Sequence, residues 1–235
     1  MRLDKFLCDS KNLSRKESKE IIKKGRVIVN DKKINDPSFS IDESKDTVLV
    51  DSVPVKYEKF VYFMLNKPKG VVSATKDNID KTVIDLFKEE ERNDLFPVGR
   101  LDKDTVGLLI VTNDGNLSHH LTSPKHHVEK TYFVRIEHPL SDSDINKLTS
   151  GIKIGDDECK PAIVKVLSDK EIELTIFEGM FHQVKRMLKA VNNEVVYLKR
   201  LSMGDLKLDE ALEEGKYRKL SDTELKILTK EGGNV

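Results

Sequence analysis

The spacing of apolar residues in the N-terminal quarter of the chain predicts two short helices. Apolar side chains at intervals of three and four residues place the first helix at residues 2–9. Ser14 and Glu17 have the spacing of a capping box, in which a hydroxyl and a carboxylate close the start of a helix. The second helix should therefore continue from there to about Lys24, with Gly25 as its left-handed stop.

A small hairpin should follow the second helix. Valines at alternate positions predict a strand at residues 27–29, after which Asn30 and Asp31 turn the chain. These elements form a compact unit that should end near Val55. Residues 51–59 contain a proline and charges of both signs, so we expect a linker there.

The remainder of the chain has many apolar strand patterns and few helical ones. Strands are predicted at residues 60–65, 108–112, 132–136, 163–167, 172–176 and 195–198, with a turn at 66–70. Helices are predicted at residues 82–90, 116–121 and 141–150. Because strands and helices do not alternate regularly, the pattern indicates an α+β fold rather than a doubly wound sheet.

Length and composition restrict the class of protein. A chain of 235 residues can form one large domain, or a small domain and a medium one. No apolar run approaches the roughly 18 residues of a membrane span, and no leader pattern opens the chain, so we expect neither a membrane protein nor a secreted precursor. Cys8 and Cys159 are isolated, so we expect neither disulfides nor a Cys-rich zinc site, which fits a reducing cytoplasm.

The charges are distributed unevenly, although their sum is zero. The first 35 residues carry 11 Lys and Arg against 5 acids, so this segment has a charge of +6 and the remainder −6. Steps of four residues place Arg15, Lys19 and Lys23 along one stripe of the predicted second helix. A solvent-exposed helix face without a ligand has the same pattern. The contrast between a positively charged N-terminal segment and a negatively charged remainder nevertheless favours binding to RNA.

Short stretches of this segment resemble the S4-type RNA-binding domain. They are Arg2-Leu3-Asp4-Lys5-Phe6-Leu7, Ser14-Arg15 and Gly25-Arg26-Val27-Ile28-Val29-Asn30. The resemblance implies a domain at residues 1–56 that grips structured RNA with its second helix, and it identifies a class of ligand but no reaction. The residues that we expect to contact RNA are Arg2, Arg15, Lys16, Lys19 and Lys23.

Two motifs of the longer C-terminal part carry charged side chains next to predicted apolar elements. Residues 99–107 (GRLDKDTVG) precede a buried strand and could present side chains at its mouth, although the spacing alone favours a surface turn. Residues 178–187 begin a helix with an apolar stripe, whose flank carries His182, Lys185 and Arg186. A cation held there could pair with a carboxylate and keep it ionised. If no carboxylate lies opposite, these basic residues simply form a solvent-exposed face of the helix.

A third motif, Glu129-Lys130-Thr131-Tyr132, begins an alternating strand. Tyr132 could stack on a nucleobase, although a tyrosine in this position is more often part of the core. The paired histidines at 119–120 and 126–127 lack carboxylates or cysteines at ligand spacing, so we expect no metal site. No phosphate-binding loop, dinucleotide fingerprint or nucleophile elbow is present, so no cofactor is expected.

Together these motifs resemble the RNA pseudouridine synthases of the RsuA family, in the same order and nearly end to end. The matching blocks are residues 66–70, 99–109, 113–115, 130–132 and 178–187, and in the tail Arg200, Gly204, Leu208, Gly215 and residues 217–220. The resemblance implies a catalytic domain at residues 57–235, with a mixed, mainly antiparallel sheet flanked by helices. Asn192 stands where the family usually has Gly, and Asn tolerates the left-handed conformation of a helix stop.

The resemblance implies that the N1–C1′ bond of a uridine is broken and the base is rejoined through C5, without a cofactor. Asp102 matches the catalytic carboxylate, as either a nucleophile at C1′ or a base at C2′. Lys185 matches its basic partner, with Arg186 as the second candidate. Arg100 matches the side chain that fills the space left by the flipped base, and Tyr132 the residue that packs against that base.

The resemblance also indicates a substrate. The form His-Gln-Val-Lys-Arg-Met is typical of the enzyme that acts on 16S rRNA near uridine 516, whereas relatives that act on 23S rRNA more often have Arg at the position of Lys185. We therefore expect 16S rRNA or a small-subunit assembly intermediate as the partner of a monomer. A synthase for 23S rRNA and a non-catalytic assembly factor are the alternatives.

Overall fold

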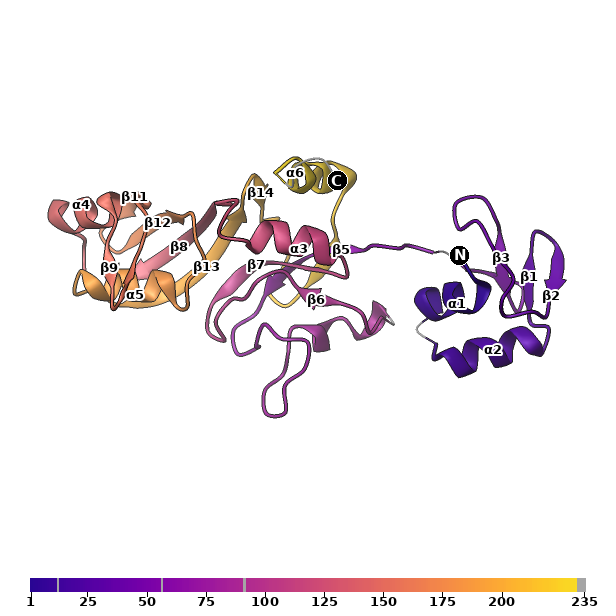
Figure 1. Cartoon of the computed structure of the whole chain (residues 1–235). Coiled ribbons are helices and arrows are strands. Elements are labelled where there is room, and N and C mark those ends of the chain that lie inside the picture. The colour runs from indigo at the N-terminus through magenta and orange to yellow at the C-terminus, as the bar shows by residue number, and fades with distance from the viewer. Residues whose placement is uncertain (12, 56, 91, 232–235) are drawn as a thin grey trace. The chain divides into compact units, whose positions relative to one another are not determined.

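The computed structural model describes residues 1–11, 13–55, 57–90 and 92–231 (Figure 1). The described chain divides into two compact units, one made of residues 1–61 and 87–94 and the other of the remainder. The predicted domain boundary at residue 56 lies outside the described residues. None of the described helices is both long and apolar enough to cross a membrane.

Two helices of the first unit begin and end close to where the sequence predicts. Helix α1 spans Leu3–Lys11 and α2 spans Arg15–Lys23. The capping box is confirmed, because the Glu17 amide donates to Ser14 Oγ at 3.2 Å and the Ser14 amide donates to the Glu17 carboxylate at 2.8 Å. Gly25 follows α2 with a φ of +66°, the left-handed conformation expected of a helix stop.

Four strands complete the first unit, in the order β2-β1-β3-β4. They span Val27–Val29 (β1), Lys32–Ile34 (β2), Val48–Val50 (β3) and Val53–Pro54 (β4). Asn30 and Asp31 form the predicted turn, with φ of 47° and 64°. The prediction of a linker from residue 51 onward is wrong, because Asp51 and Ser52 also adopt positive φ and turn the chain into β4.

The second unit is built on one nine-stranded sheet, ordered β11-β12-β8-β13-β7-β5-β15, with β14 beside β13 and β6 beside β7 (Figure 1). The strands are Tyr62–Lys67 (β5), Phe96–Pro97 (β6), Val106–Thr112 (β7), Lys130–Ile136 (β8), Ile163–Ser168 (β11), Glu171–Ile176 (β12), Val195–Met203 (β13), Leu206–Lys207 (β14) and Tyr217–Lys219 (β15). A separate hairpin joins Lys153–Ile154 (β9) to Asp157–Glu158 (β10). Strand β13 is parallel to β7 and antiparallel to β8, so the sheet is mixed and mainly antiparallel, as expected.

Helices flank this sheet and fix its position by apolar contacts. They are Gly115–Thr122 (α3), Asp142–Ser150 (α4), Gln183–Ala190 (α5) and Asp222–Glu231 (α6). Leu117 and Leu121 of α3 and Leu228 of α6 pack in one buried cluster with Met64 of β5 and Ile110 of β7. Helix α4 confirms the helix predicted at residues 141–150, with Ser141 as its N-cap and Gly151 after its last residue at a φ of 94°. The combination of mixed sheet and helices confirms the α+β class.

The predicted helix at residues 82–90 is not continuous. Only two short 3₁₀ turns form, at Ile84–Leu86 and Lys88–Glu90. Thr82 forms a bridge with Val72, and the Val83 amide donates to the Val72 carbonyl at 2.9 Å, so the start of the segment is held extended. Tertiary hydrogen bonds therefore take precedence over helix propensity in this segment.

Two strands extend beyond their predicted ends toward the loop of residues 99–105. Asn66 and Lys67 continue β5, although they were predicted in a turn, and both are buried. Val106 and Gly107 already belong to β7. Polar residues at strand ends are poor indicators of a turn when the neighbouring strand supplies backbone partners, as β7 and β5 do here.

Candidate active site

The loop that joins β6 to β7 is held by the segment that follows β5. The Leu101 amide donates to Ser73 Oγ at 3.0 Å, and the same hydroxyl donates to the Leu101 carbonyl at 2.9 Å. Beyond Asp102, the Gly70 amide donates to the Lys103 carbonyl at 2.7 Å. The backbone is therefore fixed on both sides of Asp102, whose own side chain is 24% exposed.

Lys67, the last residue of β5, supports this loop from inside the protein. Its ammonium group donates to the carbonyls of Asp102 at 3.0 Å, Thr105 at 2.8 Å and Pro68 at 3.1 Å. Burial lowers the pKa of Lys67 to about 8, although the negative charges of Asp104 and Asp102 oppose this shift. Sequence reasoning missed this role. The available signal was a charged residue that directly continues an apolar strand.

The Asp102 carboxylate faces two basic side chains of the α5 region. Asp102 Oδ2 lies 2.9 Å from Lys185 Nζ, and Oδ1 lies 3.4 Å from His182 Nε2. Lys185 Nζ also lies 2.5 Å from Asp104 Oδ1. Burial of the ammonium group opposes its charged form, but the hydrogen bonds with Asp104 and Asp102 outweigh burial and raise the pKa of Lys185. In return, although burial opposes the shift, the hydrogen bond and the charge of Lys185 lower the pKa of Asp104.

Helix α5 holds Lys185 by burying its opposite side. The predicted apolar stripe is confirmed, because Val184, Met187, Leu188 and Val191 are all buried. Gln183 fixes the turn before the helix, since its side chain accepts from the Met180 amide at 3.0 Å and donates to the Glu178 carboxylate at 3.0 Å. Asn192 follows the helix with a φ of 58°, as expected of a left-handed stop.

Arg186 points to a different part of the molecule than its neighbour Lys185. Its Nη2 donates to the Ile154 carbonyl at 2.5 Å and lies 3.1 Å from Asp157 Oδ2, so it binds the β9–β10 hairpin. Consecutive residues of a helix face about 100° apart and do not share a partner easily. Of the two basic residues that the sequence proposed for Asp102, the structure pairs it with Lys185.

A pocket opens beside Asp102, between the loop and the strands β8 and β13. Arg100 and Asp102 line its mouth with Lys185, and Tyr132 and Leu198 line its wall. Arg100 is exposed, whereas Tyr132 is only 7% exposed. The predicted residues Arg100, Asp102, Tyr132 and Lys185 are thus brought together from three separate segments of the chain: the loop before β7, strand β8 and helix α5.

Two further residues of this pocket were not singled out by the sequence as site residues. Lys130 was noted only as part of the motif that contains Tyr132, and Arg200 only as a match in the tail. Both are buried basic residues within strands, with exposed fractions of 9% and 2%. A basic residue at the start of an apolar strand pattern (Lys130) or inside one (Arg200) was the signal that could have identified them, since such residues are almost never buried without a partner.

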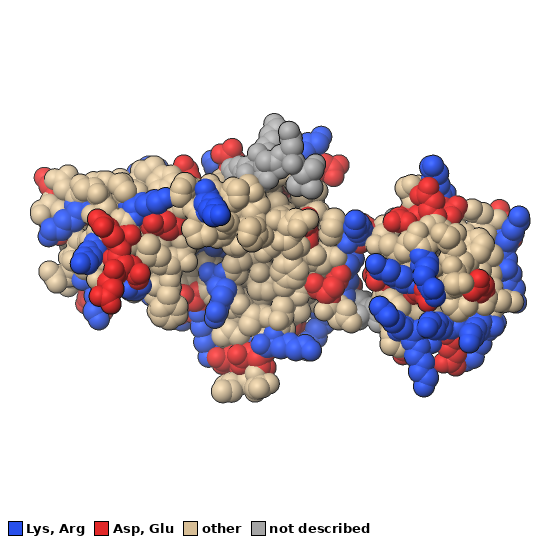
Figure 2. All heavy atoms as spheres, viewed as in Figure 1, with Lys and Arg blue, Asp and Glu red and all other residues tan. Residues whose placement is uncertain are grey.

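The basic residues predicted to contact RNA in the first unit are Arg2, which precedes α1, and four residues of α2. Arg15 and Lys19 of α2 line a hollow together with Arg2 and Lys5, and Lys16 and Lys23 are exposed on α2. Arg2 also binds Asp4, with an Nη2–Oδ2 distance of 2.8 Å. Figure 2 shows Lys and Arg gathered over the side of this unit that contains α2.

The histidines do not form a metal-binding cluster in the part of the chain that the structure describes. No group of three or more His, Cys, Asp or Glu side chains there is placed to hold a metal ion. The rings of His120 and His126 lie 3.8 Å apart, and His127 contacts Lys160.

Comparison with known proteins finds matches to both parts of the chain. Residues 1–56 match the family model of the S4 domain, and residues 61–190 match that of RNA pseudouridylate synthase. A Bacillus subtilis protein named an uncharacterized RNA pseudouridine synthase is 50% identical over 97% of this chain and 98% of its own. The ribosomal small subunit pseudouridine synthase A of Haemophilus influenzae is 40% identical over 98% of this chain and 100% of its own. A crystal structure of a pseudouridylate synthase aligns with a TM-score of 0.69 and 38% identity over 97% and 99% of the two chains.

The fold, the pocket and these matches define an RNA pseudouridine synthase that carries an S4 domain. Within that class the chain belongs to the RsuA family, because relatives named ribosomal small subunit pseudouridine synthase A match it over nearly its whole length. Both resemblances found in the sequence are confirmed.

Proposed function

We propose that this enzyme isomerises a uridine of small-subunit rRNA, at or near uridine 516, with Asp102 as its catalytic carboxylate. The observation that carries the proposal is the ion pair of 2.9 Å between Asp102 and Lys185 at the mouth of a pocket. The names of full-length relatives at about 40% identity support the small-subunit target. The enzyme then acts in the cytoplasm, on 16S rRNA or an assembling subunit, as a monomer.

The proposed chemistry requires the uridine to leave its stack and enter the pocket, at a cost of a few kcal/mol. Arg100, exposed beside the pocket, occupies the space that the base leaves, and Tyr132 packs against the base inside. Asp102 then attacks C1′ or takes the proton of C2′. Both routes need an ionised carboxylate, and the ammonium group of Lys185 lies 2.9 Å from it as its counter-ion.

The first unit supplies further affinity for RNA. Its exposed basic residues, including Arg2, Arg15, Lys16, Lys19 and Lys23, contact phosphates and orient the substrate. We also assign Arg186 to RNA contact, although its bonds to the β9–β10 hairpin leave it less free than the residues of α2.

A pseudouridine map of rRNA from cells with and without the gene tests the target. Carbodiimide modification makes reverse transcriptase stop at pseudouridine, so loss of one stop from 16S rRNA is the expected result. A stop lost from 23S rRNA instead would support the proposed reaction but contradict 16S rRNA as its substrate. An unchanged map would favour a non-catalytic assembly factor.

Asp102→Asn tests the catalytic assignment. The amide keeps the shape of the side chain but can neither attack C1′ nor accept a proton, so pseudouridine formation should fall below detection. Binding of the rRNA substrate should stay within about threefold of the unmodified protein, because one neutralised group among many contacts changes affinity little. Turnover by this variant would remove Asp102 from the mechanism.

A further inference from the structure

Two buried cations line the inner part of the pocket without a carboxylate partner. Lys130 lies on β8 and is 9% exposed; Arg200 lies on the adjacent β13 and is 2% exposed. Among the described residues, no ion pair joins either of them to an acidic side chain. Removing a charge from water without a partner is costly, so such residues are rare in protein interiors unless a ligand completes them.

The guanidinium of Arg200 is held in place but not fully bonded. Its Nε donates to the Leu108 carbonyl at 2.8 Å, whereas its buried Nη2 has no partner in the described structure. Strand register places Arg200 between Tyr132 on β8 and Gly107 on β7. A buried N–H donor without an acceptor costs about 1–3 kcal/mol. An acceptor that enters the pocket would remove this cost.

Lys130 presents a second incompletely bonded donor to the same pocket. Its Nζ donates to the Val128 carbonyl at 2.8 Å. Burial, and then the nearby charge of Arg200, lower the pKa of Lys130 to about 8. Thr105, which also lines the pocket, has a buried hydroxyl oxygen without a partner. The pocket therefore offers two cationic donors and one free hydroxyl to whatever it encloses.

We infer that Lys130 and Arg200 bind the two carbonyl oxygens of the flipped uracil and stabilise the negative charge that the ring carries during isomerisation. This inference rests on the proposed function. Uracil presents O2 and O4 as acceptors on either side of the N3–H group, and Thr105 Oγ1 is an available acceptor for N3–H. Cytosine carries an amino donor in place of O4, which two cationic donors would disfavour.

The charge arises from the bond changes of the reaction. When N1–C1′ breaks, its electron pair stays on the base, and resonance spreads the negative charge over N1, O2 and O4. When C5–C1′ forms, the ring supplies the electron pair for the new bond, C5 loses its proton, and N1 gains one. Donors that hold the oxygens more strongly in the charged state than in neutral uridine lower the barrier selectively.

Single-turnover rates of Arg200→Gln and Lys130→Met test the inference. The substrate is the rRNA that contains the mapped target uridine, in unmodified form or with 2-thio- or 4-thiouridine at that position. We expect each variant to react about 10²-fold more slowly, as when one donor to a developing oxyanion is removed, with RNA affinity nearly unchanged. Arg200→Lys should recover part of the rate. Sulfur accepts hydrogen bonds poorly. Replacing one uracil oxygen by sulfur should therefore slow the unmodified enzyme more than it slows the variant that already lacks the side chain bonded to that oxygen.

Arg218→Gln is the matched control, because this arginine of the same unit binds Asp209 and Glu224 and does not line the pocket. It should lower the melting temperature and leave the single-turnover rate unchanged below that temperature. If Arg200→Gln does not fold, the rates on the uridine and thiouridine substrates are compared in Arg200→Lys and Lys130→Met instead. Rates within about threefold of the unmodified enzyme, or thio effects that are equal in all variants, would overturn the inference. An unmodified enzyme that is inactive on rRNA would instead overturn the proposed function.

Discussion

Asp102 and Lys185 lie far apart in the sequence and form one contact of 2.9 Å that the proposed chemistry depends on. The contact has two supports: the Asp102 backbone is held by Lys67, and Lys185 is held by the buried stripe of α5. His182, at 3.4 Å from the other carboxylate oxygen, gives Asp102 a second basic neighbour. The carboxylate is therefore reachable from the pocket but restricted in orientation.

Lys185→Met and Arg186→Met form a matched pair of variants on one helix. Lys185→Met removes the charge that pairs with Asp102 and should slow single-turnover pseudouridine formation by about 10²-fold, the equivalent of a lost hydrogen bond to a charged group. Arg186→Met removes a bond to the β9–β10 hairpin and should change that rate by less than about threefold. Equal losses in the two variants would contradict the pairing in the structure.

Gly107 allows β13 to approach β7 closely, and this approach brings Arg200 beside the pocket. Its φ is +99°, and a Cβ atom at this position would lie 2.3 Å from the Arg200 carbonyl oxygen. Gly107→Ala should therefore lower the free energy of unfolding by about 3 kcal/mol, as measured by denaturant titration, because it combines backbone strain with a steric clash.

Gly115→Ala is the control for this prediction, since no heavy atom lies within 4 Å of its Cβ position and it begins α3. Its effect on the free energy of unfolding should be within about 1 kcal/mol, or slightly stabilising. Comparable destabilisation by the two substitutions would show that the close approach of β13 is not responsible.

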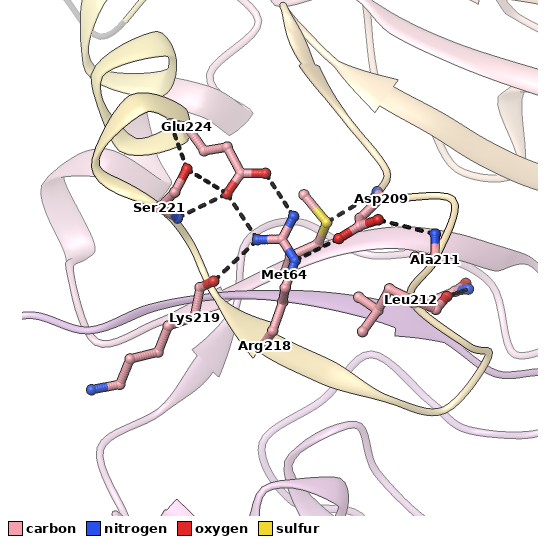
Figure 3. Close-up of polar contacts among 9 residues, drawn as sticks. Met64, Asp209, Ala211, Leu212, Arg218, Lys219, Ser221 and Glu224 are labelled. Atoms are coloured by element: carbon pink, nitrogen blue, oxygen red, sulfur yellow. Dashed lines mark hydrogen bonds and ion pairs between the residues drawn. The ribbon is translucent and has the colours of Figure 1, made fainter.

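The C-terminal helix α6 is tied to β15 by an arginine–carboxylate network (Figure 3). Arg218 donates to both oxygens of Glu224 at 2.8 Å and to Asp209 at 2.8 Å. Ser221 donates to Glu224 through its amide at 2.8 Å. The hydrogen bonds with Arg218 lower the pKa of Glu224 from its usual value to about 2, although burial opposes the shift.

Glu224→Gln should therefore destabilise the protein in a pH-dependent manner. A carboxylate whose pKa is lowered by folding contributes stability above its unfolded pKa and loses that contribution as the pH falls toward the folded value. At pH 7 the variant should unfold more easily by about 2 kcal/mol, after allowance for partial exposure. The difference from the unmodified protein should decrease between pH 4.5 and pH 2 in denaturant titrations; a constant difference would contradict the assignment.

We expect the binding of a large RNA to depend on the charge of the first unit as well as on the pocket. The triple variant Arg15→Gln, Lys19→Gln, Lys23→Gln removes the stripe of cations on α2. We expect the affinity for the rRNA substrate to fall by about 10²-fold at moderate salt, and the slope of log affinity against log salt to decrease by about 2–3. Filter binding at several salt concentrations measures both quantities.

A second triple variant with the same loss of charge is the control. Lys32, Lys33 and Lys45 lie on β2 and in the segment before β3, outside the predicted contact stripe. Their replacement by Gln should affect the salt dependence of RNA binding less than the α2 variant does. Equal effects would indicate that only the net charge of the unit matters, and not the surface of α2.

The sequence predicted elements whose stability is local. The capping box at Ser14, the stop at Gly25 and the apolar stripe of α5 all depend on residues within one or two turns, and the structure confirms them. Motif resemblance identified the family, because the order of the blocks reflects the whole fold. Elements that depend on distant partners, such as the segment at 82–90, were predicted incorrectly because the bridge between Thr82 and Val72 is not visible in local periodicity.

Tertiary structure alone decided how the charged side chains are paired. Periodicity placed Lys185 and Arg186 on one cationic flank, but only the packing of α5 against the β9 hairpin separates their partners. The partners of Lys67, Lys130 and Arg200 were likewise not visible in the sequence: a basic residue in or beside an apolar strand pattern can signal burial, but it does not tell which groups surround it. Electrostatic pairing depends on distances of a few ångströms between residues far apart in the chain, and folding of the whole sheet sets these distances.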